Sequence, residues 1–246
     1  MDILNLTKEQ SLELLDLRKK EVNVLCLEKP ELKGLTSRVA VVLDYSGSMN
    51  RLYKDGTVQA VLERLFPLAL QFDDNGEMEF WIFDDGFHRL ESINMDNYYG
   101  YIEKNVYKKY NMGCTCYAPV LKDIQKKYIK EDPAKMPNYV IFITDGNNSD
   151  AAETTKIIRE MSSDPIFIQF VGIGNQRFSF LERLDNLGGR VIDNANFFPI
   201  MDINELEDRE LYKLLLKEYP QWLGYTQVKV MIEKQGKKGF FSKLFR

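Results

Sequence analysis

Short runs of apolar residues alternate along the chain with longer segments in which apolar residues recur every three or four positions. The apolar runs at 38–43, 139–144 and 165–172 predict strands that are buried on both faces. Further strands are predicted at 78–83 and 190–198. The helical spacing predicts helices at 58–72, 98–110, 119–130, 151–161, 178–187 and 205–219. Strands that alternate with helices favour an α/β fold built on a largely parallel sheet.

Two segments depart from this alternation. Asp84-Asp85-Gly86 is a turn signal, and residues 87–93 behind it predict a short antiparallel edge strand. Near the start of the chain, Lys8 to Lys20 shows amphipathic helical spacing, and Val22 to Leu27 predicts a strand.

The chain has no linker rich in Gly, Ser or Pro and no internal repeat, so we expect one compact domain with short extensions. The expected parts are an extension of helix and strand at 1–36, a central domain at 37–200, and a C-terminal helix with a basic amphipathic tail at 201–246.

Composition narrows the class of protein. The 246 residues are 44% hydrophobic and 28% charged, as in ordinary globular domains. The net charge of −4 gives no overall attraction for nucleic acid, so we expect no nucleic-acid partner. We see no signal peptide at the start and no apolar run long enough to span a membrane. Three cysteines are too few for a disulfide framework, which favours a reducing, cytoplasmic location.

The candidate chemistry begins where the first buried strand ends. Asp44, Ser46 and Ser48 stand at alternate positions directly after that strand. In open α/β sheets, ligands bind in the crevice beyond the carboxyl ends of the strands. One carboxylate and two hydroxyls offer only oxygen, which suits Mg²⁺ or a similar hard cation. Taken alone, the same pattern is also common in a loop that caps the next helix.

Two further segments add oxygen ligands. Thr115 lies in a loop before a predicted helix, and Asp145 follows a buried strand and precedes Gly146. Parallel strands end at the same edge of a sheet, so we expect Asp44 and Asp145 to face one crevice.

The chain resembles a known family in four segments: VVLDYSGSM, CTCYAPV, FITDGNNSD and YPQWL. They are similar to von Willebrand factor type A (vWA) domains with a metal-ion-dependent adhesion site (MIDAS), of the bacterial TerF-like, tellurium-resistance group. The resemblance implies a vWA/Rossmann-like fold with a mostly parallel central sheet, one short antiparallel edge strand and helices on both faces. It also implies one divalent cation, Mg²⁺ or else Mn²⁺ or Ca²⁺, on Asp44, Ser46, Ser48, Thr115 and Asp145.

The resemblance further implies that a carboxylate from a protein partner completes the metal shell. We therefore expect a metal-dependent binding module, in bacterial stress response or tellurium resistance, and not an enzyme. The alternative is a Mg²⁺-dependent hydrolase acting on phosphoesters, but His88 is the only histidine and no pattern places it beside Ser46 or Ser48. A third interpretation is a scaffold whose cation is only structural.

Two features remain open. Cys114 and Cys116 flank Thr115, either as a pair that senses oxidants or soft metals or as two small loop side chains. Residues 234–246 combine Phe240, Phe241, Leu244 and Phe245 on one helical face with Lys and Arg around them. That pattern favours weak peripheral binding, at the inner face of a membrane or in a partner's groove, while a helix packed on its own domain or a disordered tail is the alternative.

Overall fold

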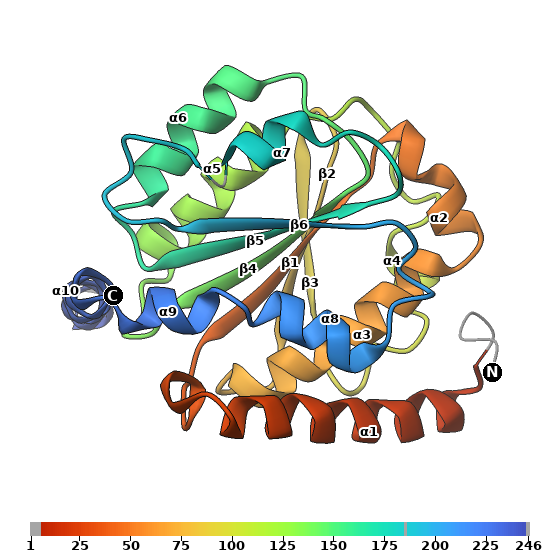
Figure 1. Ribbon diagram of the computed structural model, residues 1–246, viewed down its shortest axis with the longest axis horizontal. Coiled ribbons are helices and arrows are strands. Elements are labelled where there is room, and N and C mark those ends of the chain that lie inside the picture. Colours follow the sequence, from red (N-terminus) through yellow and green to blue (C-terminus); the bar gives the residue numbers. More distant parts are fainter. Residues whose placement is uncertain (1–5, 185, 245–246) are drawn as a thin grey trace.

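A six-stranded sheet in the order β3-β2-β1-β4-β5-β6 forms the centre of the molecule (Figure 1). The computed structural model describes residues 6–184 and 186–244, without the side chains of 238–244. All neighbouring strands are parallel except β2 and β3, which are antiparallel, as predicted. The strands are β1 Arg38–Asp44, β2 Met78–Phe83, β3 Phe87–Ile93, β4 Asn138–Thr144, β5 Ile166–Ile173 and β6 Ala195–Ile200.

Helices cover both faces of the sheet because successive residues of each buried strand point to opposite sides. Val39, Val41 and Leu43 of β1 join the core under one set of helices, while Ala40 and Val42 join the core on the other face. The first set comprises α1 Lys8–Leu27, α3 Thr57–Phe72, α4 Tyr101–Asn105, α8 Asp208–Leu215 and α9 Tyr219–Gly224. The second comprises α5 Ala118–Lys126, α6 Ala151–Met161 and α7 Ser179–Leu184 (Figure 1). The predicted fold class is confirmed.

The prediction of a strand at Val22–Leu27 is wrong, since these residues are the last turns of α1. A capping box starts the helix: the Thr7 amide donates to Gln10 Oε1 at 2.9 Å, and the Gln10 amide donates to Thr7 Oγ1 at 3.3 Å. The buried stripe that includes Leu15, Val22 and Leu25 then runs along one helical face without interruption. Burial at helical spacing therefore overrides the strand preference of the valines.

Several predicted helices are shorter than expected. The helix predicted at 98–110 reduces to α4, which begins after Gly100 in the left-handed region (φ 67°) and ends before Lys108, also at positive φ. The helix predicted at 205–219 is divided into α8 and α9, with Pro220 in the first turn of α9. The remaining helical segments are α2 Asn50–Lys54, α10 Thr226–Leu244, a π-helical turn η4 Lys127–Glu131, and the 3₁₀ turns η2 Pro30–Leu32 and η3 Gly47–Met49.

The contact between β5 and the segment before α7 requires glycine at position 172. A Cβ built on Gly172 would lie 2.7 Å from Cζ of Phe178, whose ring is buried in the core. We expect Gly172→Ala to lower the free energy of unfolding by about 1–3 kcal/mol, because the ring has to shift. Urea denaturation measures this. Gly188→Ala is the control, since a Cβ there meets no atom within 4 Å, and equal stability of the two variants would contradict the prediction.

Candidate metal centre

The parallel pairing of β1 with β4 brings two of the predicted ligands to one edge of the sheet. Leu43 is level with Ile143 in the register, so Asp44 and Thr144 end the two strands side by side. The Thr144 hydroxyl donates a 2.6 Å hydrogen bond to Asp44 Oδ2. Asp44 is fully buried, and Asp145, the next residue after Thr144, is 8% exposed.

The two predicted serines lie between these carboxylates. The Ser46 amide donates to Asp44 Oδ1 at 2.8 Å, and the hydroxyls of Ser46 and Ser48 are 3.0 Å apart. The Ser48 hydroxyl donates to Asp145 Oδ1 at 2.8 Å. Four of the five predicted residues therefore belong to one connected group of oxygens, with Ser48 exposed to solvent.

The fifth predicted residue, Thr115, lies in a loop that is hydrogen-bonded to the segments after β1 and β4. The Gly113 carbonyl accepts a hydrogen bond from the Gly47 amide at 3.2 Å, beside the bridge between Ser46 and Gly113. The Thr115 carbonyl accepts from the amide and hydroxyl of Ser149, at 2.8 and 2.9 Å. The Thr115 backbone is thus held next to the group, and its half-buried hydroxyl has no hydrogen bond within the described part of the chain.

Glycine at position 113 is a further requirement of this loop. A Cβ on Gly113 would lie 2.3 Å from Asp85 Oδ1 and 2.9 Å from Asp84 Oδ2. The Cys116 amide also donates to the Asp84 carbonyl at 2.8 Å. The turn after β2 therefore packs against the Thr115 loop, a contact that sequence reasoning did not identify.

The main electrostatic feature of the site is that the carboxylates of Asp44 and Asp145 are buried. Burial raises the pKa of Asp44 to about 6, although the hydrogen bonds from Thr144 and Ser46 oppose the shift. Burial also raises the pKa of Asp145, against the hydrogen bond from Ser48. Among the described residues, neither carboxylate forms an ion pair with Lys or Arg. A cation between them would remove this unfavourable charge, so the residues fit a metal ion.

The chemistry of the donors fits a hard cation. Two carboxylates and three hydroxyls are all oxygen, as Mg²⁺, Mn²⁺ or Ca²⁺ prefers. Within the part of the chain that the structure describes, no three His, Cys, Asp or Glu residues gather as a metal-binding group. A site at this edge therefore has to use the serine and threonine hydroxyls.

Sequence reasoning missed the residues that hold the first carboxylate. Besides Thr144, the Tyr53 hydroxyl donates to the Asp44 carbonyl at 2.9 Å. The Tyr117 hydroxyl donates to the Gly146 carbonyl at 2.6 Å and fixes the turn after Asp145. Thr144 was recognisable as the polar end of a buried strand, whereas the two tyrosines carry no signal in the local pattern.

The neighbouring thiols and the single histidine add little reactivity. All three cysteines are free, and Cys114 and Cys116 are exposed and half-buried. Burial raises the pKa of Cys116 against the hydrogen bond to Ser149, and Asp150 and Asp85 raise it further, which is opposite to the lowered pKa of a reactive cysteine. His88 is exposed on β3, and its ring contacts that of Tyr110 in a tilted arrangement, with 4.3 Å between the ring centres.

Comparisons with known proteins settle the family. A family model described as the vWA found in the TerF C terminus matches residues 36–232. The chain belongs to this vWA-TerF-like family. The uncharacterized protein YcbR of Bacillus subtilis (strain 168) is 45% identical over 242 residues, which are 94% of this chain and 98% of YcbR.

Solved structures share the vWA fold at low sequence identity. The conserved hypothetical protein BatB from Bacteroides thetaiotaomicron is 14% identical with a TM-score of 0.51, covering 74% of this chain and 98% of BatB. The SpRpn10 VWA domain is 11% identical with a TM-score of 0.50, covering 78% and 100%. Proximal thread matrix protein 1 from the mussel byssus, solved with a zinc-occupied MIDAS motif, is 17% identical with a TM-score of 0.53. That match covers 74% of this chain and less than half, 46%, of the mussel protein.

Proposed function

We propose that this vWA domain is a metal-dependent protein-binding module. Asp44, Ser46, Ser48, Thr115 and Asp145 hold one divalent cation, Mg²⁺ or alternatively Mn²⁺ or Ca²⁺. The observation that carries the proposal is the pair of buried carboxylates that lack a cationic partner among the described residues and are linked by serine hydroxyls. The zinc-occupied MIDAS of the mussel vWA protein supports the same use of the fold.

The residues of the site have different roles in binding the cation. Asp44 and Asp145 supply the negative charge, and the hydrogen bonds from Thr144 and the Ser46 amide hold Asp44 in one orientation. The three hydroxyls are neutral, so two carboxylates balance a divalent ion without saturating it. When bound, the cation supplies an open coordination position for an acidic side chain of the partner. Because Thr115 comes from a separate loop, that part of the shell can rearrange as the partner binds.

Binding is favoured over hydrolysis of phosphoesters because a hydrolase needs a placed general base. The single histidine packs against the Tyr110 ring on the exposed edge strand β3, and two carboxylates are fewer than a two-metal hydrolase uses. On family membership alone, we extend the proposal to a role in bacterial stress response or tellurium resistance.

A pull-down from bacterial lysate tests the proposed function. We expect the wild-type chain to retain specific proteins in Mg²⁺, and both EDTA and Asp44→Ala to release them, because each removes the bridging cation. Asp202→Asn is the control, since Asp202 is an exposed carboxylate outside the proposed ligand set. The same retained proteins with EDTA and with Asp44→Ala would contradict the proposal, and metal-dependent turnover of a phosphoester would favour the hydrolase.

A further inference from the structure

The C-terminal helix α10 lies at the edge of the sheet opposite the candidate metal centre. Its Gln235 amide donates a 2.6 Å hydrogen bond to the Tyr128 carbonyl, and Gly236 packs against Lys135, which shortly precedes β4. These contacts lie where the parallel strands begin, whereas Asp44 and Asp145 lie where they end. Figure 1 shows α10 and α2, which follows the metal-site serines, on opposite sides of the molecule.

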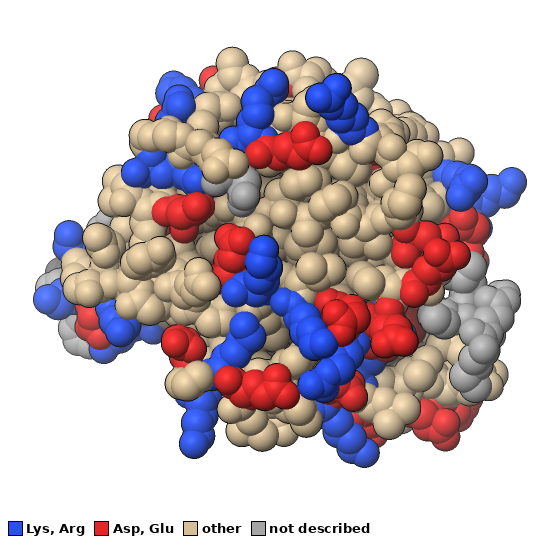
Figure 2. Space-filling view, viewed as in Figure 1, with Lys and Arg blue, Asp and Glu red and all other residues tan. Residues whose placement is uncertain are grey.

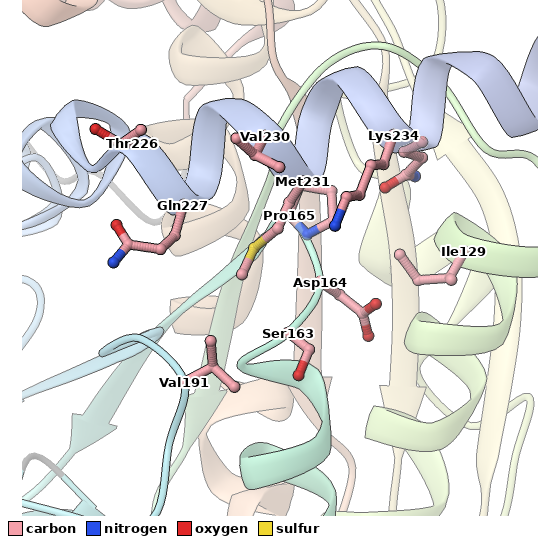
Figure 3. Close-up of a pocket in the computed structure, with 11 residues that line it drawn as sticks. Ile129, Ser163, Asp164, Pro165, Val191, Thr226, Gln227, Val230, Met231 and Lys234 are labelled. Atoms are coloured by element: carbon pink, nitrogen blue, oxygen red, sulfur yellow. The ribbon is translucent and has the colours of Figure 1, made fainter.

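A hollow remains between the first half of α10 and the surface on which the helix packs. Val228 and Gln235 are buried and attach the helix. The hollow, of about 630 Å³, lies under the helix, along its residues from Thr226 to Gln235. Figure 3 shows walls of mixed apolar and polar side chains, with α10 above and Ser163, Asp164 and Val191 below. The apolar residues that line it are Ile129, Pro165, Val191, Val230 and Met231.

This end of the molecule exposes apolar surface beside positive charge. Val191 and Val230, both at the hollow, are 61% and 45% exposed. Lys229, Lys234 and Lys237 of α10 are exposed, and the exposed Glu233 of the same helix pairs with Lys135. Figure 2 shows Lys and Arg side chains at this end with an acidic side chain among them. The one carboxylate in the hollow, Asp164, accepts a 2.7 Å hydrogen bond from Gln125 of α5.

Charge is distributed very unevenly along the chain. Residues 234–246 hold five of the 33 Lys and Arg residues and none of the 37 Asp and Glu residues. The backbone stays helical through Leu244. The predicted apolar face at 240–245 lies outside the side chains that the structure describes, so it remains a prediction from the sequence. A basic segment with interspersed aromatic residues, attached to an acidic body, is typical of peripheral membrane anchors.

We propose that the α10 end binds an anionic membrane surface, with the helix lying in the interface. None of the helices in the described part of the chain has the length and hydropathy of a membrane span. The acidic body is repelled by anionic headgroups while the basic end is attracted, and this orients the molecule with α10 toward the lipid. The opposite edge, with the candidate metal centre, then faces away and stays accessible. The α10 residues that would contact the lipid are distinct from the residues of the candidate metal centre.

Sedimentation of the full chain with vesicles tests the inference. We expect binding to vesicles of phosphatidylglycerol and phosphatidylcholine, little binding to pure phosphatidylcholine, and loss of binding as salt rises. Lys237→Glu/Lys238→Glu reverses two charges at the interface and lowers the partition at least about tenfold. Phe240→Ser/Phe241→Ser lowers it comparably by removing apolar contact.

The controls separate this inference from general charge effects and from the metal centre. Lys19→Glu/Lys20→Glu makes the same charge change at exposed positions of α1 and leaves the partition within about twofold. EDTA leaves vesicle binding unchanged, because the cation serves the other edge. A wild-type chain that stays in the supernatant, even where α10 retains a protein instead, overturns the proposal. Equal loss in the α1 control and in the tail variants overturns it as well.

Discussion

Asp44→Asn is expected to lower the affinity for Mg²⁺ at least about 100-fold, because it removes one of the two charges that hold the cation. Asn keeps the shape of the side chain: its Oδ1 can still accept the hydrogen bond from the Ser46 amide, and its Nδ2 can donate to the Thr144 hydroxyl oxygen in place of the bond that Asp44 accepts. The variant therefore separates loss of the metal from loss of the fold. Titration calorimetry with Mg²⁺ and with Mn²⁺ measures the affinity directly.

Thermal unfolding gives a second measurement of the same effect. A cation at 100 times its dissociation constant stabilises the wild-type protein by about 2.7 kcal/mol, since it binds only the folded chain. We expect this metal-dependent gain to vanish in Asp44→Asn and to persist in Asp202→Asn, whose exposed carboxylate lines the hollow beside Ser48 and Asp145. An unchanged metal response in Asp44→Asn would exclude the proposed centre.

The second large effect concerns the link between α8 and the helices α1 and α3. Asp208 accepts hydrogen bonds from Nε of Arg18 at 2.8 Å and from Nε of Arg64 at 2.6 Å. The two arginine side chains are only 4% and 3% exposed. Asp208→Ala leaves two buried guanidinium groups without their carboxylate, so we expect the free energy of unfolding to fall by about 3 kcal/mol. This value is at the lower end of the range of about 3–5 kcal/mol for breaking a buried ion pair, because Asp208 is itself 29% exposed.

Urea denaturation measures the loss of stability in Asp208→Ala. A neighbouring ion pair on the same helix provides the matched control. Glu210 and Lys213 of α8 form a pair in which both side chains are about half exposed. Glu210→Ala is expected to change the free energy of unfolding by less than about 1 kcal/mol, since solvent screens the pair. If Asp208→Ala were as mild as Glu210→Ala, the buried arginines would not depend on Asp208.

Most strands were predictable because their signal is local, but the strand predicted at 190–198 begins only at Ala195 and ends at Ile200. The runs at 78–83 and 87–93 match β2 and β3 in full, and the buried runs before Asp44 and Asp145 match β1 and β4 to within a residue. Helix limits were less accurate, since Gly100, Lys108 and Pro220 act through backbone geometry that an apolar spacing does not reveal. Val22–Leu27 was assigned wrongly because its burial depends on α3, which is distant in sequence.

The sequence by itself determined the α/β class and which residues carry oxygen at the strand ends, because both follow from neighbours a few positions apart. The tertiary structure decided how those oxygens are held. Thr144 meets Asp44 across 100 residues, and Arg64 meets Asp208 across 144. Tertiary packing also set α10 at the edge opposite Asp44, since only the three-dimensional course of the chain places one end of the sheet relative to the other. Such contacts arise from strand register and helix packing, and no local pattern encodes them.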